Sequence, residues 1–113
     1  MTTKVRREKG ITILEPKGKI MGSSASELWA EISPQIEGSD TPRILINFEH
    51  VNKVDSTGLG VMMKARAVVA RKKGRVGVIN VSKHIGNLIV MSRLVSLFER
   101  FDNEAAAVSR LSA

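Results

Sequence analysis

Val51-Asn52-Lys53-Val54-Asp55-Ser56-Thr57-Gly58-Leu59-Gly60 joins two segments of different character. Before it, residues 44–48 form an apolar run with the length and composition of a buried strand. After it, a helix-forming stretch begins at Leu59 and extends to Gly74. Between the two, Asp55, Ser56 and Thr57 carry side-chain oxygens that can accept hydrogen bonds from the first turn of a helix. The sequence therefore predicts a strand, a short loop and exposed hydroxyls at a helix start.

Ser56 has two interpretations at this position. Serine, threonine and aspartate are ordinary N-caps, and capping alone explains most such residues. A helix N-terminus also favours negative charge, because its first N–H groups are unpaired and the helix dipole is positive there. A phosphate on Ser56 would therefore be well accommodated. Spacing alone leaves both interpretations open.

The segment from Asn47 to Gly60, with Val-Asp-Ser-Thr-Gly-Leu-Gly at its centre, resembles the signature of the STAS domain family, in particular its anti-anti-sigma factors. The flanking segments follow in family order, so the resemblance covers nearly the whole chain. It implies an anti-sigma factor antagonist that binds a serine-kinase anti-sigma factor and releases it when Ser56 is phosphorylated. A phosphatase would reset the switch. The partner-binding residues implied are Asp55, Ser56, Thr57, Gly58, Leu59 and Gly60.

Bulk composition indicates one globular domain over residues 1–113, with 42% hydrophobic and 26% charged residues. The absence of cysteine excludes disulfides, zinc-thiolate sites and thiol catalysis. No apolar segment follows the basic N-terminus as in a secretory signal, and no apolar run approaches the roughly 18 residues of a membrane span. We therefore expect a cytoplasmic protein without a cofactor or a metal.

The formal charge of +7 raises nucleic-acid binding as an alternative. Basic residues cluster at Lys4–Lys9 and along Lys64–Arg75, the second cluster comprising Lys64, Arg66, Arg71, Lys72, Lys73 and Arg75. Aromatic content is only 4%, however, and no zinc-finger or RNA-stacking pattern is present. A solvated helix face is the commoner explanation of such a run.

The remaining patterns predict an α/β fold with a central mixed sheet of four to five strands, an N-terminal hairpin and about four helices. Strands are expected at residues 4–9, 11–15, 19–21, 43–48 and 75–81, with a turn at Pro16 and Gly18. The spacing of strand, helix and strand around Ser56 implies a parallel pair with a right-handed crossover.

The helix assignments rest on caps and periodicity. A capping box of Ser24 and Glu27 starts the first helix, which Pro34 is expected to end or kink near Ser33. Leu28, Trp29, Ile32 and Ile36 share its apolar side. The helix after Ser56 has an apolar arc of about 200°, so part of the arc is expected to be exposed.

Towards the C-terminus, Gly74 is expected as the C′ residue of that helix. Ser82 is the expected cap of the next helix, with Ile85, Leu88 and Ile89 on its inner face. Residues 95–98 read as a short edge strand. Asp102 or Asn103 then caps a last helix over residues 104–111.

Catalytic motifs fail at specific positions. His50 and His84 are not spaced as metal ligands. A nucleophile elbow needs glycine where Val54 stands, and a dinucleotide fingerprint needs glycine where Met63 stands. Three alternatives to the partner switch remain. They are a STAS docking subunit of a stress-signalling or membrane lipid-transport assembly, a nucleic-acid binder, and a small hydrolase that uses Ser56.

Overall fold

The computed structural model describes residues 2–81, 85 and 87–113, and in that part of the chain it has six strands and four helices. The strands are β1 Thr2–Glu8, β2 Ile11–Ile20, β3 Arg43–Asn47, β4 Val51–Val54, β5 Arg75–Ile79 and β6 Glu99–Arg100. The helices are α1 Ser23–Glu37, α2 Ser56–Arg71, α3 Leu88–Leu97 and α4 Glu104–Leu111. The predicted α/β fold with an N-terminal hairpin and about four helices is confirmed. β4 and β6, both short, were not predicted.

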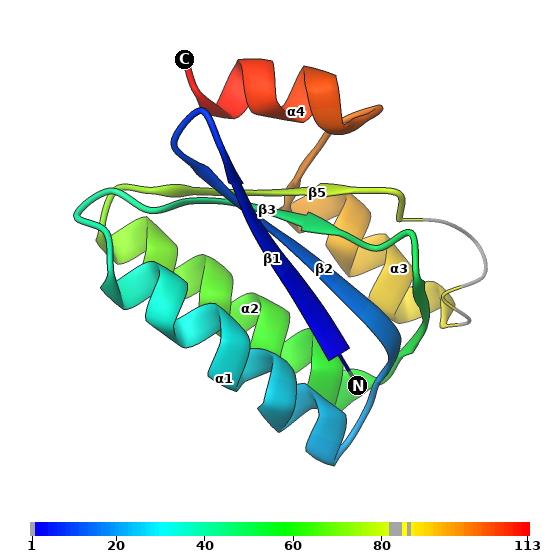
Figure 1. The fold of residues 1–113 in the computed structure, drawn as a ribbon. Helices are drawn as coiled ribbons and strands as arrows, with labels where there is room; N and C mark the ends of the chain where they lie inside the picture. Colours follow the sequence, from blue (N-terminus) through cyan, green and yellow to red (C-terminus); the bar gives the residue numbers. More distant parts are fainter. Residues whose placement is uncertain (1, 82–84, 86) are drawn as a thin grey trace.

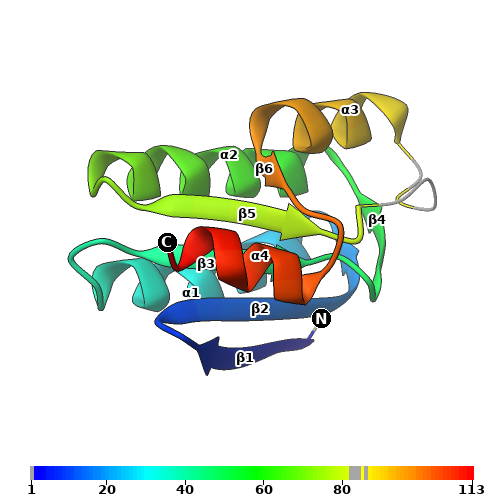
Figure 2. The ribbon, with the colours of Figure 1, turned by 90° about the horizontal axis from the view of Figure 1, so that it is seen from above.

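The strands form a mixed sheet in the order β1-β2-β3-β5-β6, with β4 paired to β2 (Figure 1). Among the strand pairs of the described residues, only β1–β2 is antiparallel, and the predicted parallel pairing of β3 with β5 is confirmed. Figures 1 and 2 show α1, α2 and α3 against one face of the sheet and α4 against the other. β3 therefore buries both faces, with Ile44 and Ile46 in the larger core and Leu45 under α4.

The N-terminal hairpin turns at Lys9 and Gly10, whose φ angles are 51° and 79°. A two-residue loop with both φ angles positive matches the twist of an antiparallel pair, and glycine adopts such angles without steric cost. The predicted hairpin is confirmed, with β1 ending at Glu8.

The turn predicted at Pro16 and Gly18 is wrong, because β2 continues through both residues to Ile20. Its residues 12–14 pair with β3 and its residues 18–20 pair with β4. Pro16, which has no N–H to donate, lies between these two parallel partners, where its missing hydrogen bond is tolerated. The separate strand predicted at residues 19–21 is therefore the end of β2, reached through a bulge after Gly18.

α1 continues through Pro34 to Glu37, so the helix does not end near Ser33, which was one of the two outcomes predicted for this proline. Proline removes one helical hydrogen bond, but tertiary contacts hold the turn that follows. Ile36 is buried, and Nζ of Lys72 donates to the Ile36 carbonyl at 3.0 Å and to the Ser39 carbonyl at 2.8 Å.

The start of α1 also differs from the prediction. The helix begins at Ser23 with Gly22 as its N-cap, and no side chain caps it. The N–H groups of Ser24 and Ala25 donate to the Met21 and Gly22 carbonyls instead. The capping box assigned to Ser24 is therefore wrong.

α3 begins at Leu88, where the Oδ1 atom of Asn87 accepts from the N–H groups of Ile89 and Val90 at 3.0 and 3.2 Å. The predicted cap, Ser82, lies outside the described residues. Val90 and Leu94 form the buried face of α3. Ile85 is buried as predicted.

Two C-terminal predictions are wrong. Leu88 and Ile89 are exposed rather than inward-facing. Residues 95–97 belong to α3, and the strand that follows is β6, which pairs with β5. The last helix is confirmed, with Asn103 as its cap, because Oδ1 of Asn103 accepts from the N–H of Ala106 at 2.8 Å.

Candidate functional site at the amino end of α2

Asp55 connects the end of β4 to the start of α2. Its N–H donates to the Ile20 carbonyl at 3.3 Å, which ties the connection to the end of β2. Its Oδ1 atom accepts from the N–H of Gly58 at 2.8 Å, and its carbonyl accepts from the N–H of Leu59 at 2.9 Å. Asp55 is thus the N-cap, and α2 begins at Ser56, three residues before the predicted start.

Gly58 lets α2 approach the sheet closely. A Cβ atom on Gly58 would lie 2.4 Å from the Ile20 carbonyl oxygen and 2.9 Å from Cγ1 of Val54. Gly60 differs, because it is exposed and a Cβ atom there would meet nothing within 4 Å. The first glycine is required by packing, whereas the second has no steric reason inside this chain.

The six predicted partner-binding residues divide into two groups. Ser56, Thr57 and Gly60 are exposed. Asp55 and Leu59 are half-buried and Gly58 is buried, with Leu59 packed against the larger core. Ser56 and Gly60 are four residues apart in α2, so they lie on one face of the helix, one turn from each other. The structure therefore presents the Ser56 hydroxyl one turn from an exposed helix position that has no side chain.

The electrostatics around Ser56 are mixed. In the part of the chain that the structure describes, the N–H groups of Ser56 and Thr57 have no hydrogen-bond acceptor within the protein. These groups and the helix dipole favour an anion at this point. The Asp55 carboxylate is adjacent but is already engaged with Gly58. A phosphate on Ser56 would therefore lie near these two N–H donors, which attract it, and near the Asp55 carboxylate, which repels it.

The apolar arc of α2 is mostly used for packing. Met62, Ala65 and Val69 are buried. Its half-buried members all contact the larger core, and they are Leu59, Val61, Met63 and Val68. Only Ala70 of the predicted arc is exposed. The exposed part of the arc is thus smaller than its width suggested.

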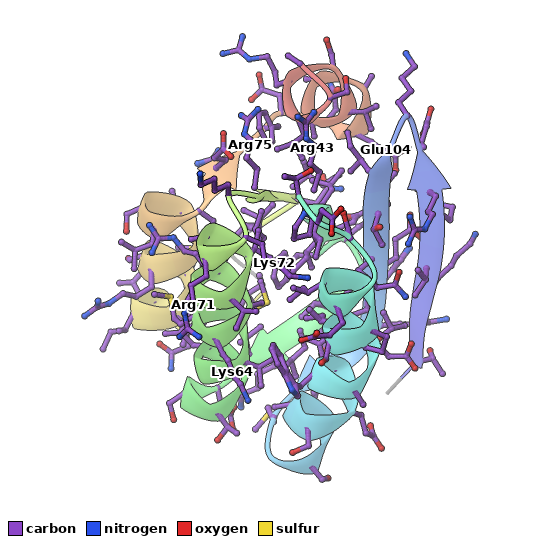
Figure 3. All side chains as sticks on the ribbon, turned by 90° about the vertical axis from the view of Figure 1, so that its left-hand side faces the viewer. Arg43, Lys64, Arg71, Lys72, Arg75 and Glu104 are labelled. Carbon is purple, nitrogen blue, oxygen red and sulfur yellow. The ribbon has the colours of Figure 1, made fainter. Side chains whose placement is uncertain are left out.

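The basic cluster of α2 and its exit does not form one continuous charged face. Figure 3 shows Lys72 between α1 and α2, where it caps the C-terminus of α1. Nζ of Lys64 lies 4.3 Å from the centroid of the half-buried Trp29 ring, a cation–π distance. Arg75 pairs with Glu99, which raises the pKa of the guanidinium, and Nη1 of Arg75 also donates to the Arg110 carbonyl at 2.8 Å.

Two further arginines hold α4 in place. Nη1 of Arg43 donates to the Leu111 carbonyl at 2.8 Å and so caps the end of α4 (Figure 3). Arg6 pairs with Glu104 at the start of α4 and with Glu15 on β2, and these carboxylates raise its pKa. Sequence reasoning missed these roles, because no local pattern connects the residues. Part of the positive charge, on Arg6, Arg43, Lys72 and Arg75, therefore stabilises helix ends and ion pairs.

Other candidate chemistry gains no support in the described residues. His50 is exposed in the turn before β4, and His84 lies outside the described part. Within residues 2–81, 85 and 87–113, no three histidine or acidic side chains gather as a metal site would require. No helix in those ranges is long and apolar enough to cross a bilayer.

Comparison with known proteins identifies related sequences and folds. The family model of the STAS domain matches residues 2–107. An anti-sigma F factor antagonist of Paenibacillus polymyxa is 22% identical over 107 residues, which cover 95% of this chain and 92% of that protein.

Solved structures agree with the family match. An anti-sigma factor antagonist from Mycobacterium paratuberculosis matches with a TM-score of 0.82 and 20% identity, over 99% of this chain and 94% of that one. The anti-sigma factor antagonist SpoIIAA in its unphosphorylated form gives a TM-score of 0.74 and 21% identity, over 96% of each chain. The phosphorylated form of SpoIIAA from Bacillus gives a TM-score of 0.71 and 22% identity, over 96% of this chain and 98% of that one.

Proposed function

Because this chain belongs to the STAS domain family, we propose that it is an anti-sigma factor antagonist that acts by partner switching. With Ser56 unmodified it binds a serine-kinase anti-sigma factor, and phosphorylation of Ser56 releases that partner. The observation that carries the proposal is the exposed Ser56 hydroxyl at the first position of α2, beside two N–H groups that have no acceptor among the described residues. The chain is a binding protein in this scheme, working in the cytoplasm, and the catalysis belongs to its partners.

The residues around Ser56 have distinct roles in this proposal. Asp55 fixes the start of α2 and so the direction of the hydroxyl. Leu59 and Gly58 hold the turn against the core. Thr57 is also exposed, so it is the nearest competing phosphate acceptor. Gly60 leaves room for the partner's backbone one turn from Ser56.

Energetics explain why one phosphate could release the partner without unfolding the protein. Phosphorylation adds about −1.5 to −2 charges at neutral pH. At a helix N-terminus such a charge contributes on the order of 0.3–1 kcal/mol in favour of the fold, partly offset here by Asp55. An unpaired charge buried in an interface costs several kcal/mol, and each 1.4 kcal/mol is tenfold in affinity. The effect on binding therefore exceeds the effect on folding.

One relative supports the part of this argument that concerns folding. SpoIIAA was solved in both an unphosphorylated and a phosphorylated form, and both forms share the fold of this chain. In that protein, phosphorylation and the native fold coexist. We extend this to the present chain as part of the proposal.

The test uses purified chain and a purified serine-kinase anti-sigma factor from the same organism. Calorimetric titration should show binding of the wild type, and Ser56→Asp should weaken it roughly a hundredfold or more. The thermal midpoint of Ser56→Asp should stay close to that of the wild type. Ser56→Ala should bind but take up no phosphate from ATP.

Thr57→Ala is the matched control, because it removes the neighbouring exposed hydroxyl. It should bind the kinase and should be phosphorylated at Ser56, as mapped by mass spectrometry. Phosphate on Thr57 alone, or equal affinity for the wild type and Ser56→Asp, would refute the switch. Binding without any phosphate transfer would instead indicate a STAS docking subunit that has no phosphorylation cycle.

A further inference from the structure

Two adjacent aliphatic side chains are left outside the core at the start of α3. Leu88 is 74% exposed and Ile89 is 72% exposed. Among the described residues, the one other large hydrophobic side chain classed as exposed is Val5, at 37%, on β1. Isolated apolar residues on a surface are ordinary, but two neighbours with such high exposure form a local apolar patch.

The core does not account for this patch. α3 packs inward through Val90 and Leu94, four residues apart, and Phe98 extends the same row beyond the helix. The hydrogen bonds of Asn87 to the N–H groups of Ile89 and Val90 fix the first turn. That turn therefore holds Leu88 and Ile89 pointing away from the core while the inner face is already filled.

The position of the patch relates it to Ser56. α3 packs against α2, and both helices begin at the same end of the molecule, at the right of Figures 1 and 2. Stable interfaces of standard size bury about 800 Å² on each partner. The principal extents of the chain are 32 × 26 × 23 Å, so an interface of that area is comparable to one whole side of it. A protein bound over Ser56 would therefore also cover the start of α3.

We infer that Leu88 and Ile89 form the apolar part of the surface that receives the serine-kinase anti-sigma factor, next to the Ser56 contact. This inference rests on the proposed function, because the partner is the one that acts on Ser56. The matching surface of the kinase is apolar and lies beside its active site. Contact through Leu88 and Ile89 supplies affinity, while Ser56 supplies the phosphate-sensitive contact.

The test compares Leu88→Ser and Ile89→Ser with the wild type, using the same purified kinase and the same titration. Each substitution removes an aliphatic side chain that the bound kinase would bury, so each should weaken binding about tenfold or more. Val5→Ser is the control, because it replaces an exposed aliphatic residue on β1, at the opposite edge of the sheet from β6 and α3. It should bind as the wild type does. All three variants should keep the circular dichroism spectrum of the wild type.

Phosphorylation kinetics give a second readout. If the patch only provides binding, Leu88→Ser and Ile89→Ser should raise the KM for the chain as a kinase substrate and leave kcat nearly unchanged. Wild-type affinity and KM in both variants, with Ser56→Asp still impaired, would refute the patch and leave the partner switch standing.

Two other outcomes also decide the matter. If the wild type binds no serine-kinase anti-sigma factor, the proposed function fails and this inference fails with it. If sedimentation shows that the wild type forms a dimer that Leu88→Ser abolishes, and kinase binding is unaffected, then a second copy of the chain covers the patch and the inference is wrong.

Discussion

The Asp55 carboxylate accepts a hydrogen bond from the backbone N–H of Gly58 at 2.8 Å, and this contact fixes where α2 begins. Gly58 in turn lies against the Ile20 carbonyl, which also accepts from the Asp55 N–H, so the cap, the helix start and the end of β2 are in direct contact. Ser56 lies between the two residues of this contact and takes its position from it. The placement of the hydroxyl therefore depends on residues that stabilise the fold as well.

Replacement of Asp55 separates its capping role from its charge. Asp55→Ala removes the acceptor for the Gly58 N–H and should lower the free energy of unfolding by about 1 kcal/mol. Asp55→Asn keeps an acceptor oxygen, so its free energy of unfolding should fall by less. The remaining loss is chiefly the favourable interaction of the carboxylate with the helix dipole. Urea unfolding of both variants measures the difference. Equal losses of unfolding free energy in the two variants would show that the hydrogen bond from the Gly58 N–H contributes nothing to stability.

The two glycines near the start of α2 should respond to alanine with opposite signs. Gly58→Ala forces a methyl group against the Ile20 carbonyl and should destabilise the protein by roughly 1–3 kcal/mol, despite the better helix propensity of alanine. Gly60→Ala meets open space and should stabilise it by about 0.5–1 kcal/mol. The urea midpoints at an unchanged m-value report both effects.

Gly60→Ala also addresses function, because a more stable protein that binds its kinase less well cannot be explained by unfolding. Under the proposed function, the added methyl group beside Ser56 should reduce kinase affinity. Ala67→Ser is a suitable comparison, since it changes an exposed residue farther along α2. Wild-type affinity in Gly60→Ala would show that the partner does not approach this glycine closely.

The sequence was sufficient where local signals and tertiary structure agree. The apolar run of β3, the parallel partner β5 and the helix that follows Asp55 were predicted, because composition, caps and periodicity all indicate the same elements. The exposure of Ser56 followed from its place at a helix start. The start itself was placed three residues late, since Asp55, Ser56 and Thr57 were all candidate caps and the local pattern did not choose among them.

The errors occurred where distant contacts decide the structure. Pro34 does not end α1, because Lys72 holds the carbonyl groups beyond it. Pro16 does not break β2, because the strand changes its parallel partner at that point. Residues 88–91 are all apolar, so periodicity could not decide which of them face inward. The cap at Asn87 and the packing of Val90 decide it.

The end of α2 offers a stabilising substitution. The N–H of Lys73 donates to the Ala70 carbonyl and that of Gly74 to the Val69 carbonyl, so Lys73, with φ of 58°, is the C′ residue predicted at Gly74. Lys73→Gly should raise the free energy of unfolding by about 1 kcal/mol, because glycine adopts this conformation without strain. Lys73→Ala removes the charge but keeps the Cβ atom, so it should give no such gain in urea unfolding.

Gly74 has a different constraint. A Cβ atom there would lie 2.0 Å from the Pro42 carbonyl oxygen, so the residue is glycine because the β5 and β3 segments approach closely. The assignment of Gly74 as the C′ residue was therefore wrong, and packing rather than backbone conformation explains this glycine. The same distinction separates Gly58 from Gly60 at the other end of α2.

Lys72 should contribute to stability as a cap of α1 rather than as a surface charge. Lys72→Met keeps an apolar stem of similar length but removes the donors to the Ile36 and Ser39 carbonyls, and it should cost about 1–2 kcal/mol in urea unfolding. Hydrogen exchange should show the largest loss of protection in the last turn of α1, beyond Pro34, where no other side chain in the described residues caps those carbonyls.

Lys73→Met is the control for the loss of stability in Lys72→Met. It removes the same charge from the next residue, which is exposed, and the substituted residue still has a Cβ atom. Its effect should stay within about 0.5 kcal/mol. Equal destabilisation by the two substitutions would assign the effect to net charge and refute the cap. A loss confined to Lys72→Met would show that part of the basic cluster is committed to the fold, which leaves Lys64, Arg66, Arg71 and Lys73 as its exposed members.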